Sequence, residues 1–188
     1  MSRLIGLCGR SCSGKTTVAR HISRTQHMTH LETDRFSRVS TPSRWGQYAN
    51  WECPESVRMD KMKESLERLK NGRPAWIPSA RGTEVFDERI DPLQKVIADG
   101  FLLYVDDDIA SIFDVKIYLD VSDETILHRR AARDVRHPLC ASEYIRQVVI
   151  PASKTYDALQ KRKADVVIDA NGDVKSVCRA VERIVSEK

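Results

Sequence analysis

Residues 9–16 read G-R-S-C-S-G-K-T, which is the pattern G-x-x-x-x-G-K-[ST]. A short apolar run, Leu4 to Cys8, precedes this stretch, and a segment of helical composition, Thr16 to Thr25, grows out of it, so the order is strand, glycine loop, helix. Gly9 and Gly14 allow a turn whose backbone N–H groups point inward at anionic oxygens. The N-terminus of the following helix adds partial positive charge. The stretch therefore predicts a phosphate-binding loop.

Two side chains at the end of this loop carry the chemistry. Lys15 is expected to reach the β- and γ-phosphates of a nucleoside triphosphate, and the Thr16 hydroxyl to ligate a bridging Mg²⁺. We expect ATP to contact the following residues of the stretch: Gly9, Ser11, Cys12, Ser13, Gly14, Lys15, Thr16 and Thr17.

Length and composition set the outer limits. A chain of 188 residues suits a single α/β domain over residues 1–188. Lys and Arg (31) exceed Asp and Glu (27) only slightly and are spread along the chain, so we expect neither a nucleic-acid nor a membrane partner. The cysteines form no C-x-x-C pair and are odd in number, which favours reduced thiols and a soluble, cytoplasmic protein. No basic leader with a long apolar stretch opens the chain, and no apolar run is long enough to cross a bilayer.

Strand and helix patterns alternate along the chain. Strands are predicted over 4–8, 27–33, 93–98, 115–121 and 165–168, and helices over 16–25, from Pro54 to about 70, 125–135, 142–163 with a kink at Pro151, and 174–185. Short strands at 76–78 and 85–86 are expected around Arg81-Gly82. Residues 35–53 read as a long loop, and such loops are usually functional. This order predicts an α/β fold with a parallel sheet covered by helices on both faces and active groups at the carboxyl ends of its strands.

Acidic residues close two of these strands. Asp34 ends the second strand and is a candidate general base, or alternatively a helix or turn cap. His30, Glu32 and Asp34 share one strand face, which also leaves a metal cluster open. Asp99 ends the third strand, where phosphate-loop proteins place the second carboxylate of the magnesium site.

The predicted helix at 125–135 is rich in arginine. Arg130 and Arg133 are three residues apart and lie on one face, with Arg129 beside them. Such a face can close on phosphate and stabilise transition-state charge, or it can be a solvated helix face.

These motifs resemble the uridine kinase and nicotinamide riboside kinase branch of the phosphate-loop kinases, over nearly the whole chain. The matching segments are G-R-S-C-S-G-K-T-T (9–17), D-R-F (34–36), A-D-G-F-L-L-Y (98–104), R-R-A-A-R-D (129–134) and A-D-V-V-I (164–168). The segment N-W-E-C-P-E-S-V (50–57) is closer to the riboside kinases. The resemblance implies a three-layer fold around a five-stranded parallel sheet, with a small lid at about 134–142. It also implies transfer of the ATP γ-phosphate to a ribose 5′-hydroxyl.

The resemblance also assigns roles residue by residue. It makes Asp34 the base, places Phe36 of the D-x-F motif on the substrate side, and makes Glu52 the carboxylate that holds the ribose 2′- and 3′-hydroxyls. Arg130 would lie on the substrate side, and Arg133 on the ATP phosphates as a catalytic residue with Lys15. The magnesium ligands would be Thr16 and Asp99, with Arg129 among the ATP contacts.

Departures from the family pattern concentrate on the acceptor side. Glu52 stands where the family usually has Asp, and Asp99 where it usually has Glu. The tyrosine and histidine that read a pyrimidine are absent from I-P-S-A-R-G-T-E-V (77–85). The side chains available to contact a base, with core packing as the alternative for the aromatic ones, are Trp45, Tyr48, Trp51 and Arg81.

Other functions stay open at this level. A GTPase switch lacks support, since N-K-x-D is absent. A kinase of another small hydroxyl acceptor, such as pantothenate or a sugar phosphate, and a non-catalytic nucleotide-binding regulatory module are the remaining alternatives.

Overall fold

The sheet at the centre of the fold is parallel and five-stranded, in the order β2-β7-β1-β8-β9. The computed structural model describes residues 1–38, 44–46, 48–133 and 142–186, without the side chain of Trp45. The strands are β1 (Arg3–Gly9), β2 (Thr29–Glu32), β7 (Lys95–Gly100), β8 (Val115–Asp120) and β9 (Val166–Asp169). This is the sheet that the alternating pattern predicts.

The middle strand, β1, pairs with β7 on one side and β8 on the other. Leu4, Ile5 and Leu7 are fully buried, because a strand inside a parallel sheet is covered on both faces. The registers Leu7↔Asp99 and Glu32↔Asp99 bring the ends of three strands to the same edge.

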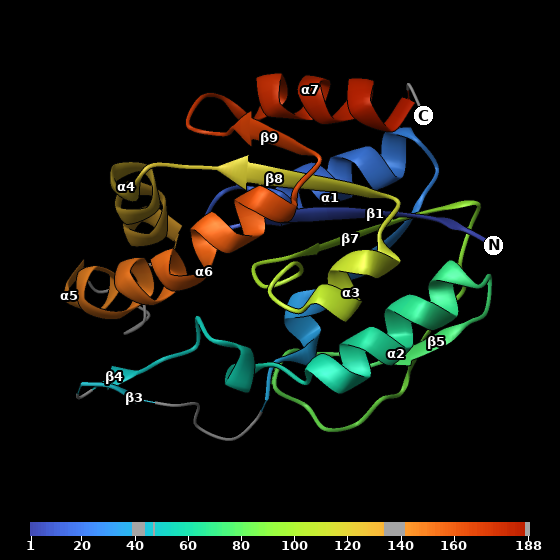
Figure 1. The fold of residues 1–188 in the computed structure, drawn as a ribbon, viewed down its shortest axis with the longest axis horizontal. Helices are drawn as coiled ribbons and strands as arrows, with labels where there is room; N and C mark the ends of the chain where they lie inside the picture. Colours follow the sequence, from blue (N-terminus) through green and yellow to red (C-terminus); the bar gives the residue numbers. More distant parts are fainter. Residues whose placement is uncertain (39–43, 47, 134–141, 187–188) are drawn as a thin grey trace.

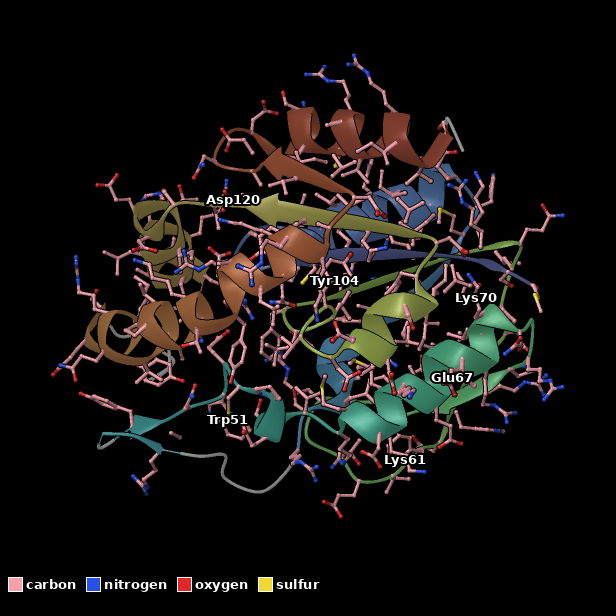
Figure 2. The ribbon with its side chains drawn as sticks, viewed as in Figure 1. Trp51, Lys61, Glu67, Lys70, Tyr104 and Asp120 are labelled. Carbon is pink, nitrogen blue, oxygen red and sulfur yellow. The ribbon has the colours of Figure 1, made fainter. Side chains whose placement is uncertain are left out.

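Helices cover both faces of the sheet, and Figure 1 shows α3 and α6 in front of the strands and α1 behind them. The helices are α1 (Lys15–Thr25), α2 (Met59–Lys70), α3 (Asp107–Ile112), α4 (Asp123–Arg133), α5 (Ser142–Tyr144), α6 (Ile150–Lys163) and α7 (Val174–Ser186). One core lies under α1 and α7, and a second under α2 and α3. Met62, Leu66 and Leu69 of α2 are buried in the second core, whereas Lys61 and Glu67, labelled with Lys70 in Figure 2, are exposed. These apolar positions, three and four residues apart, are the ones that the sequence pattern assigns to the core.

The functional edge is the one toward which β8 and β9 point, where α4 and α5 gather in Figure 1. The described part of residues 35–53 lies near this edge. It holds the end of the 3₁₀ helix η1 (Thr33–Phe36) and a hairpin of β3 (Arg44–Trp45) and β4 (Tyr48–Ala49). Residues 39–43 and 47 of this loop, and all but Ser142 of the expected lid at 134–142, lie outside the described residues.

The helix expected to begin at Pro54 begins later. Pro54–Ser56 forms only a 3₁₀ turn, η2, and α2 starts at Met59. The break has a clear cause, because Val57 pairs with Ser37 in an antiparallel bridge and the Arg58 N–H donates to the Phe36 carbonyl at 2.9 Å. Both contacts need extended backbone, which a helix cannot supply.

Several boundaries also differ from expectation. β7 starts two residues later than predicted and includes Asp99, because the Leu93 N–H donates to the Thr29 hydroxyl at 2.9 Å instead of joining the sheet. The short strand expected at 85–86 is β6 (Glu88–Ile90), which pairs antiparallel with β5 (Ala75–Ile77). Helix α3 was not predicted; it is short, and its start is marked by Asp106, whose carboxylate accepts from the Ile109 N–H.

The helix expected over 142–163 is continuous in α5, a π-helical segment η4 (Ile145–Val149) and α6. The wide π turn comes just before Pro151, which has no N–H to donate into the helix. The π segment interrupts the regular α-helix next to Pro151, which is one of the two forms, interruption or kink, that the proline predicts.

Candidate active site

The phosphate-binding loop joins β1 to α1, as the motif predicts. A Cβ at Gly9 would lie 2.5 Å from the Leu119 carbonyl oxygen, so only glycine fits there without a shift. Gly14 has φ 93° and Cys12 has φ 62°, both in the left-handed region that such a loop needs. α1 then begins at Lys15, whose Nζ donates to the Arg10 carbonyl at 2.9 Å. The loop has the curled form that a bound phosphate requires.

Arg10 connects this loop to helices α4 and α6, contacts that the motif does not predict. Its side chain is 5% exposed, and its guanidinium pairs with Asp123 of α4 at 2.8 Å and donates to Ser153 of α6 at 3.0 Å. Asp123 and Ser153 are more than 100 residues away in the sequence, so only the fold brings them to Arg10.

The predicted magnesium ligands meet at the edge of the sheet. The Thr16 hydroxyl donates to Asp99 Oδ2 at 2.6 Å. Hydroxyl and carboxylate oxygens are hard ligands, and Mg²⁺ is usually held by one or two carboxylates together with substrate phosphates, so these residues fit that ion. His30 Nε2 lies 2.6 Å from Asp99 Oδ1, a contact that the sequence did not predict.

The alternative metal cluster of His30, Glu32 and Asp34 is wrong. His30 contacts Asp99, Glu32 pairs with Arg20 at 2.9 Å, and Asp34 lies in η1, past the end of β2. The described residues contain no group of three or more His, Cys, Asp or Glu side chains that could hold a metal ion.

Asp34 lies across the loop from the phosphate side and forms an ion pair with Arg81. Arg81 comes from the turn between β5 and β6 and is 55% exposed. Asp34 lies in the first turn of η1, and its carboxylate pairs with this guanidinium. Both residues line the same cavity as Lys15 and Thr16.

Glu52 is a second carboxylate that lines this cavity. It is 7% exposed and pairs with Arg130 of α4 at 3.1 Å. Arg130 also donates to the Ser11 hydroxyl and stacks on the Tyr144 ring, 5.9 Å from its centroid. Burial, and secondarily the negative charge of Glu52, raises the pKa of Tyr144 to about 12, so its hydroxyl keeps its proton. Arg130 thus links the phosphate-binding loop to the acceptor side.

Arg129 and Arg133 also lie at the loop. The Arg129 guanidinium donates to the carbonyls of Cys12 at 3.3 Å and Ala170 at 2.9 Å. Arg133 Nη1 lies 3.9 Å from Cys12 Sγ. The arginine face expected from the sequence therefore points at the phosphate-binding loop and not at solvent alone.

One cavity of about 940 Å³ brings most of the predicted site together. The predicted residues that line it are Ser11, Cys12, Gly14, Lys15, Thr16, Thr17, Asp34, Trp51, Glu52, Arg81, Arg129, Arg130 and Arg133. Trp51 follows β4 on the chain, and Figure 2 shows it on the segment that leads toward α2. The lining also includes Arg20, Arg38 and Glu32, so cations outnumber carboxylates, as a polyphosphate site requires.

Other predicted residues stay outside this cavity. Phe36 is fully buried and packs on Phe86, with ring centroids 6.2 Å apart, so its expected place on the substrate side is wrong. Tyr48 packs edge-on against Tyr144 at 5.9 Å, which is the core alternative. The side chain of Trp45 is outside the described residues. Gly9, Ser13 and Asp99 lie behind the cavity wall.

A second cavity, of about 420 Å³, lies on the other side of the loop. It is lined by Ser13, Gly14, Thr17, Val18, Arg129, Ala170, Gly172, Val174 and Val177. Its wall is mostly apolar, and three of its residues, Gly14, Thr17 and Arg129, also line the larger cavity. This cavity was not predicted; the one local signal near it is the Asn171-Gly172 turn after the last strand.

Comparison with known proteins decides the family. The model of the phosphoribulokinase / uridine kinase family matches residues 4–176. The chain belongs to the phosphoribulokinase / uridine kinase family. It is therefore a phosphate-loop kinase, an ATP-dependent phosphotransferase, as the motifs predict. A uridine kinase of Brevibacillus brevis is 28% identical over 185 residues, which cover 90% of this chain and 85% of that protein.

Solved structures agree with the family in fold. A Bacillus stearothermophilus protein described as a possible uridine kinase has a TM-score of 0.61 at 18% identity, covering 89% of each chain. Shikimate kinase from Acinetobacter baumannii, in complex with shikimate, has a TM-score of 0.62 at 20% identity, covering 100% of this chain and 96% of that one. At these identities the likeness concerns the fold alone.

In the described part of the chain, no helix is both long and apolar enough to span a bilayer. Among the described residues, Cys8, Cys12 and Cys178 are free thiols.

Proposed function

We propose that this kinase transfers the γ-phosphate of ATP to the 5′-hydroxyl of a ribonucleoside, with uridine, cytidine and nicotinamide riboside as the candidate acceptors. One observation carries the proposal: a single cavity is lined by Lys15 and Thr16 of the phosphate-binding loop and by the carboxylates Asp34 and Glu52. The similarity to proteins named uridine kinase supports a nucleoside acceptor.

The donor would lie along the phosphate-binding loop. Its triphosphate would contact the loop N–H groups, Lys15 and Arg133, and its base would enter the smaller cavity between Val18 and Val177. Arg129 lines both cavities, which suits a nucleotide that runs from one to the other.

Mg²⁺ would be held by Thr16 and Asp99 together with the phosphates, where it would neutralise charge on the transferred phosphoryl group. The 2.6 Å hydrogen bond between these two side chains shows that they already lie together at the loop.

The acceptor hydroxyl would approach from the side of Asp34. Asp34 accepts its proton while the hydroxyl oxygen forms a bond to the γ-phosphorus and the bond from that phosphorus to the bridging oxygen of ADP breaks. Glu52 accepts hydrogen bonds from the ribose 2′- and 3′-hydroxyls, with Arg130 beside it. Arg130 and Arg133 stabilise the charge on the phosphoryl group in flight.

A second acceptor class is favoured by a specific observation. Arg38 and Arg81 line the acceptor side of the cavity, and no side-chain partner is described for Arg38 among the described residues. An uncommitted guanidinium there suits an anionic acceptor, such as pantothenate or a sugar phosphate. A non-catalytic regulatory module has less support, because donor and acceptor groups share one cavity.

The testing experiment is a panel of acceptors with Mg-ATP: uridine, cytidine, nicotinamide riboside, pantothenate and ribose 5-phosphate. The proposal expects a 5′-monophosphate from at least one nucleoside at higher kcat/KM than any product from the anionic acceptors. Turnover of an anionic acceptor alone would select the second class. No phosphorylated product from any acceptor in the panel would refute both. A cytoplasmic location and the absence of nucleic-acid and membrane partners stay predictions.

A further inference from the structure

His30 contacts the carboxylate that the proposed magnesium site uses. It lies on β2, next to β7, and the register Glu32↔Asp99 places His30 two residues before the partner of Asp99. Its Nε2 is 2.6 Å from Asp99 Oδ1. In the tautomer that carries its proton on Nε2, the imidazole donates this hydrogen bond to the Asp99 carboxylate.

Asp99 depends on few partners. Its side chain is 2% exposed, and a carboxylate so deeply buried needs hydrogen bonds to both oxygens. Oδ2 accepts from the Thr16 hydroxyl and Oδ1 meets His30. In the part of the chain that the structure describes, no lysine or arginine forms an ion pair with Asp99.

We propose that His30 is a positioning residue of the magnesium site, which holds the Asp99 carboxylate in the orientation that presents Oδ2 to Thr16. Without the imidazole, Oδ1 loses its side-chain donor, and the carboxylate is free to turn about its terminal bond. Groups that orient a metal ligand typically change metal affinity by about 10- to 100-fold. The inference rests on the proposed Mg-ATP site and is independent of which acceptor is phosphorylated.

Two variants separate this role from simple packing. His30→Phe keeps a ring of similar shape without a donor, whereas His30→Gln places an amide N–H near the position of Nε2. The control is His21→Phe, because His21 also pairs with a carboxylate, Glu182 at 3.0 Å, but lies on the exposed contact between α1 and α7.

The measurement is ATP binding by calorimetry, first in EDTA and then with increasing Mg²⁺. We expect His30→Phe to bind ATP in EDTA like the wild type, but to need about 10-fold more Mg²⁺ for half of the metal-dependent gain in affinity. His30→Gln should recover part of that loss, and His21→Phe should behave like the wild type.

Three results would overturn the inference. The first is an unchanged Mg²⁺ requirement in His30→Phe. The second is a loss of ATP binding in EDTA equal to that in Mg²⁺, which would indicate damage to the loop itself. The third is a wild-type protein whose ATP affinity does not respond to Mg²⁺. A failed acceptor panel would leave this binding result standing, so the two proposals fail separately.

Discussion

At the scale of single residues, Glu52 illustrates what a loop side chain can do when the fold buries it. It comes from the long loop at 35–53, yet it is 7% exposed and faces Arg130. Glu is one methylene longer than the Asp expected here from the family resemblance. Its carboxylate accepts from the Arg130 guanidinium, which also donates to the Ser11 hydroxyl. Arg130 therefore joins Glu52, the proposed ribose ligand, to the phosphate-binding loop.

Glu52→Gln should raise the KM for the acceptor by about 10-fold or more, because hydrogen bonds to a charged acceptor contribute about 1.5–3 kcal/mol. The KM for ATP should change little. The matched control is Glu55→Gln, three residues along the chain and exposed. Steady-state kinetics with the best acceptor of the panel checks this, and an equal rise in both KM values would show that Glu52 acts on the loop instead.

At the same scale, sequence patterns identified the residues whose chemistry is local. Lys15 and Thr16 follow from the motif, and Asp34 and Asp99 from their places at strand ends. Phe36 was misplaced, because the pattern D-x-F does not say which way an aromatic ring points. His30 and Arg10 were missed as site residues, since their partners, Asp99, Asp123 and Ser153, come from distant parts of the chain.

At the scale of elements, the turn from β1 to α1 is held by close packing as well as by glycine flexibility. A methyl group at Gly9 would meet the Leu119 carbonyl at 2.5 Å and the Ser13 hydroxyl at 2.8 Å. The carbonyl belongs to β8 and cannot move without disturbing the sheet.

Gly9→Ala should therefore lower the free energy of unfolding by about 1–3 kcal/mol, the usual cost of overpacking, and should weaken ATP binding. Gly172→Ala is the control for stability, since its Cβ would meet nothing within 4 Å, and it should stay within about 0.5 kcal/mol of the wild type. Urea unfolding measures both. A Gly9→Ala protein as stable as the wild type would show that the loop is looser than its packing indicates.

Element boundaries were predictable where one local rule acts. The long helices and the buried strands follow from their periodicity, and Pro151 marks the π turn. The helix start at Met59 was not predictable from Pro54, because the bridge between Val57 and Ser37 joins segments that only the fold brings together. β6 was shifted for the same reason, since its partner strand, β5, sets its register.

At the scale of the whole molecule, two partly exposed carboxylates, Asp114 and Asp123, join distant parts of the sheet and its helices. Asp114, before β8, accepts from the Leu4 N–H of β1 at 2.7 Å and pairs with Lys70 of α2. Burial alone would raise its pKa, but the hydrogen bonds from Lys70 and Leu4 outweigh that effect and lower the pKa below 3.8. Burial would likewise raise the pKa of Asp123, but its hydrogen bonds with Lys154 and Arg10 outweigh that effect and lower the pKa.

These shifts predict the acid limb of stability. Because the pKa of each group is lower in the folded state than in the unfolded state, their stabilisation is fully present above the unfolded value of 3.8 and is lost as the pH falls through the folded values. Urea unfolding from pH 7 to pH 3 should show the decline, and Asp114→Asn should flatten it. Asp87→Asn, at an exposed position, is the control. If the free energy of unfolding of Asp114→Asn falls with pH as steeply as that of the wild type, Asp114 does not contribute to the decline.

The proposed phosphoryl transfer is tested most directly by following labelled γ-phosphate from ATP to a ribonucleoside, in the wild type and in Asp34→Asn. Asn keeps the size of Asp34 but cannot take the proton of the attacking hydroxyl, a contribution of about 100-fold or more. We predict a labelled 5′-monophosphate from the wild type. In Asp34→Asn we predict a kcat that is at least about 100-fold lower, with the ATP affinity of the wild type. No transfer to any nucleoside by the wild type, or full transfer by Asp34→Asn, would contradict it.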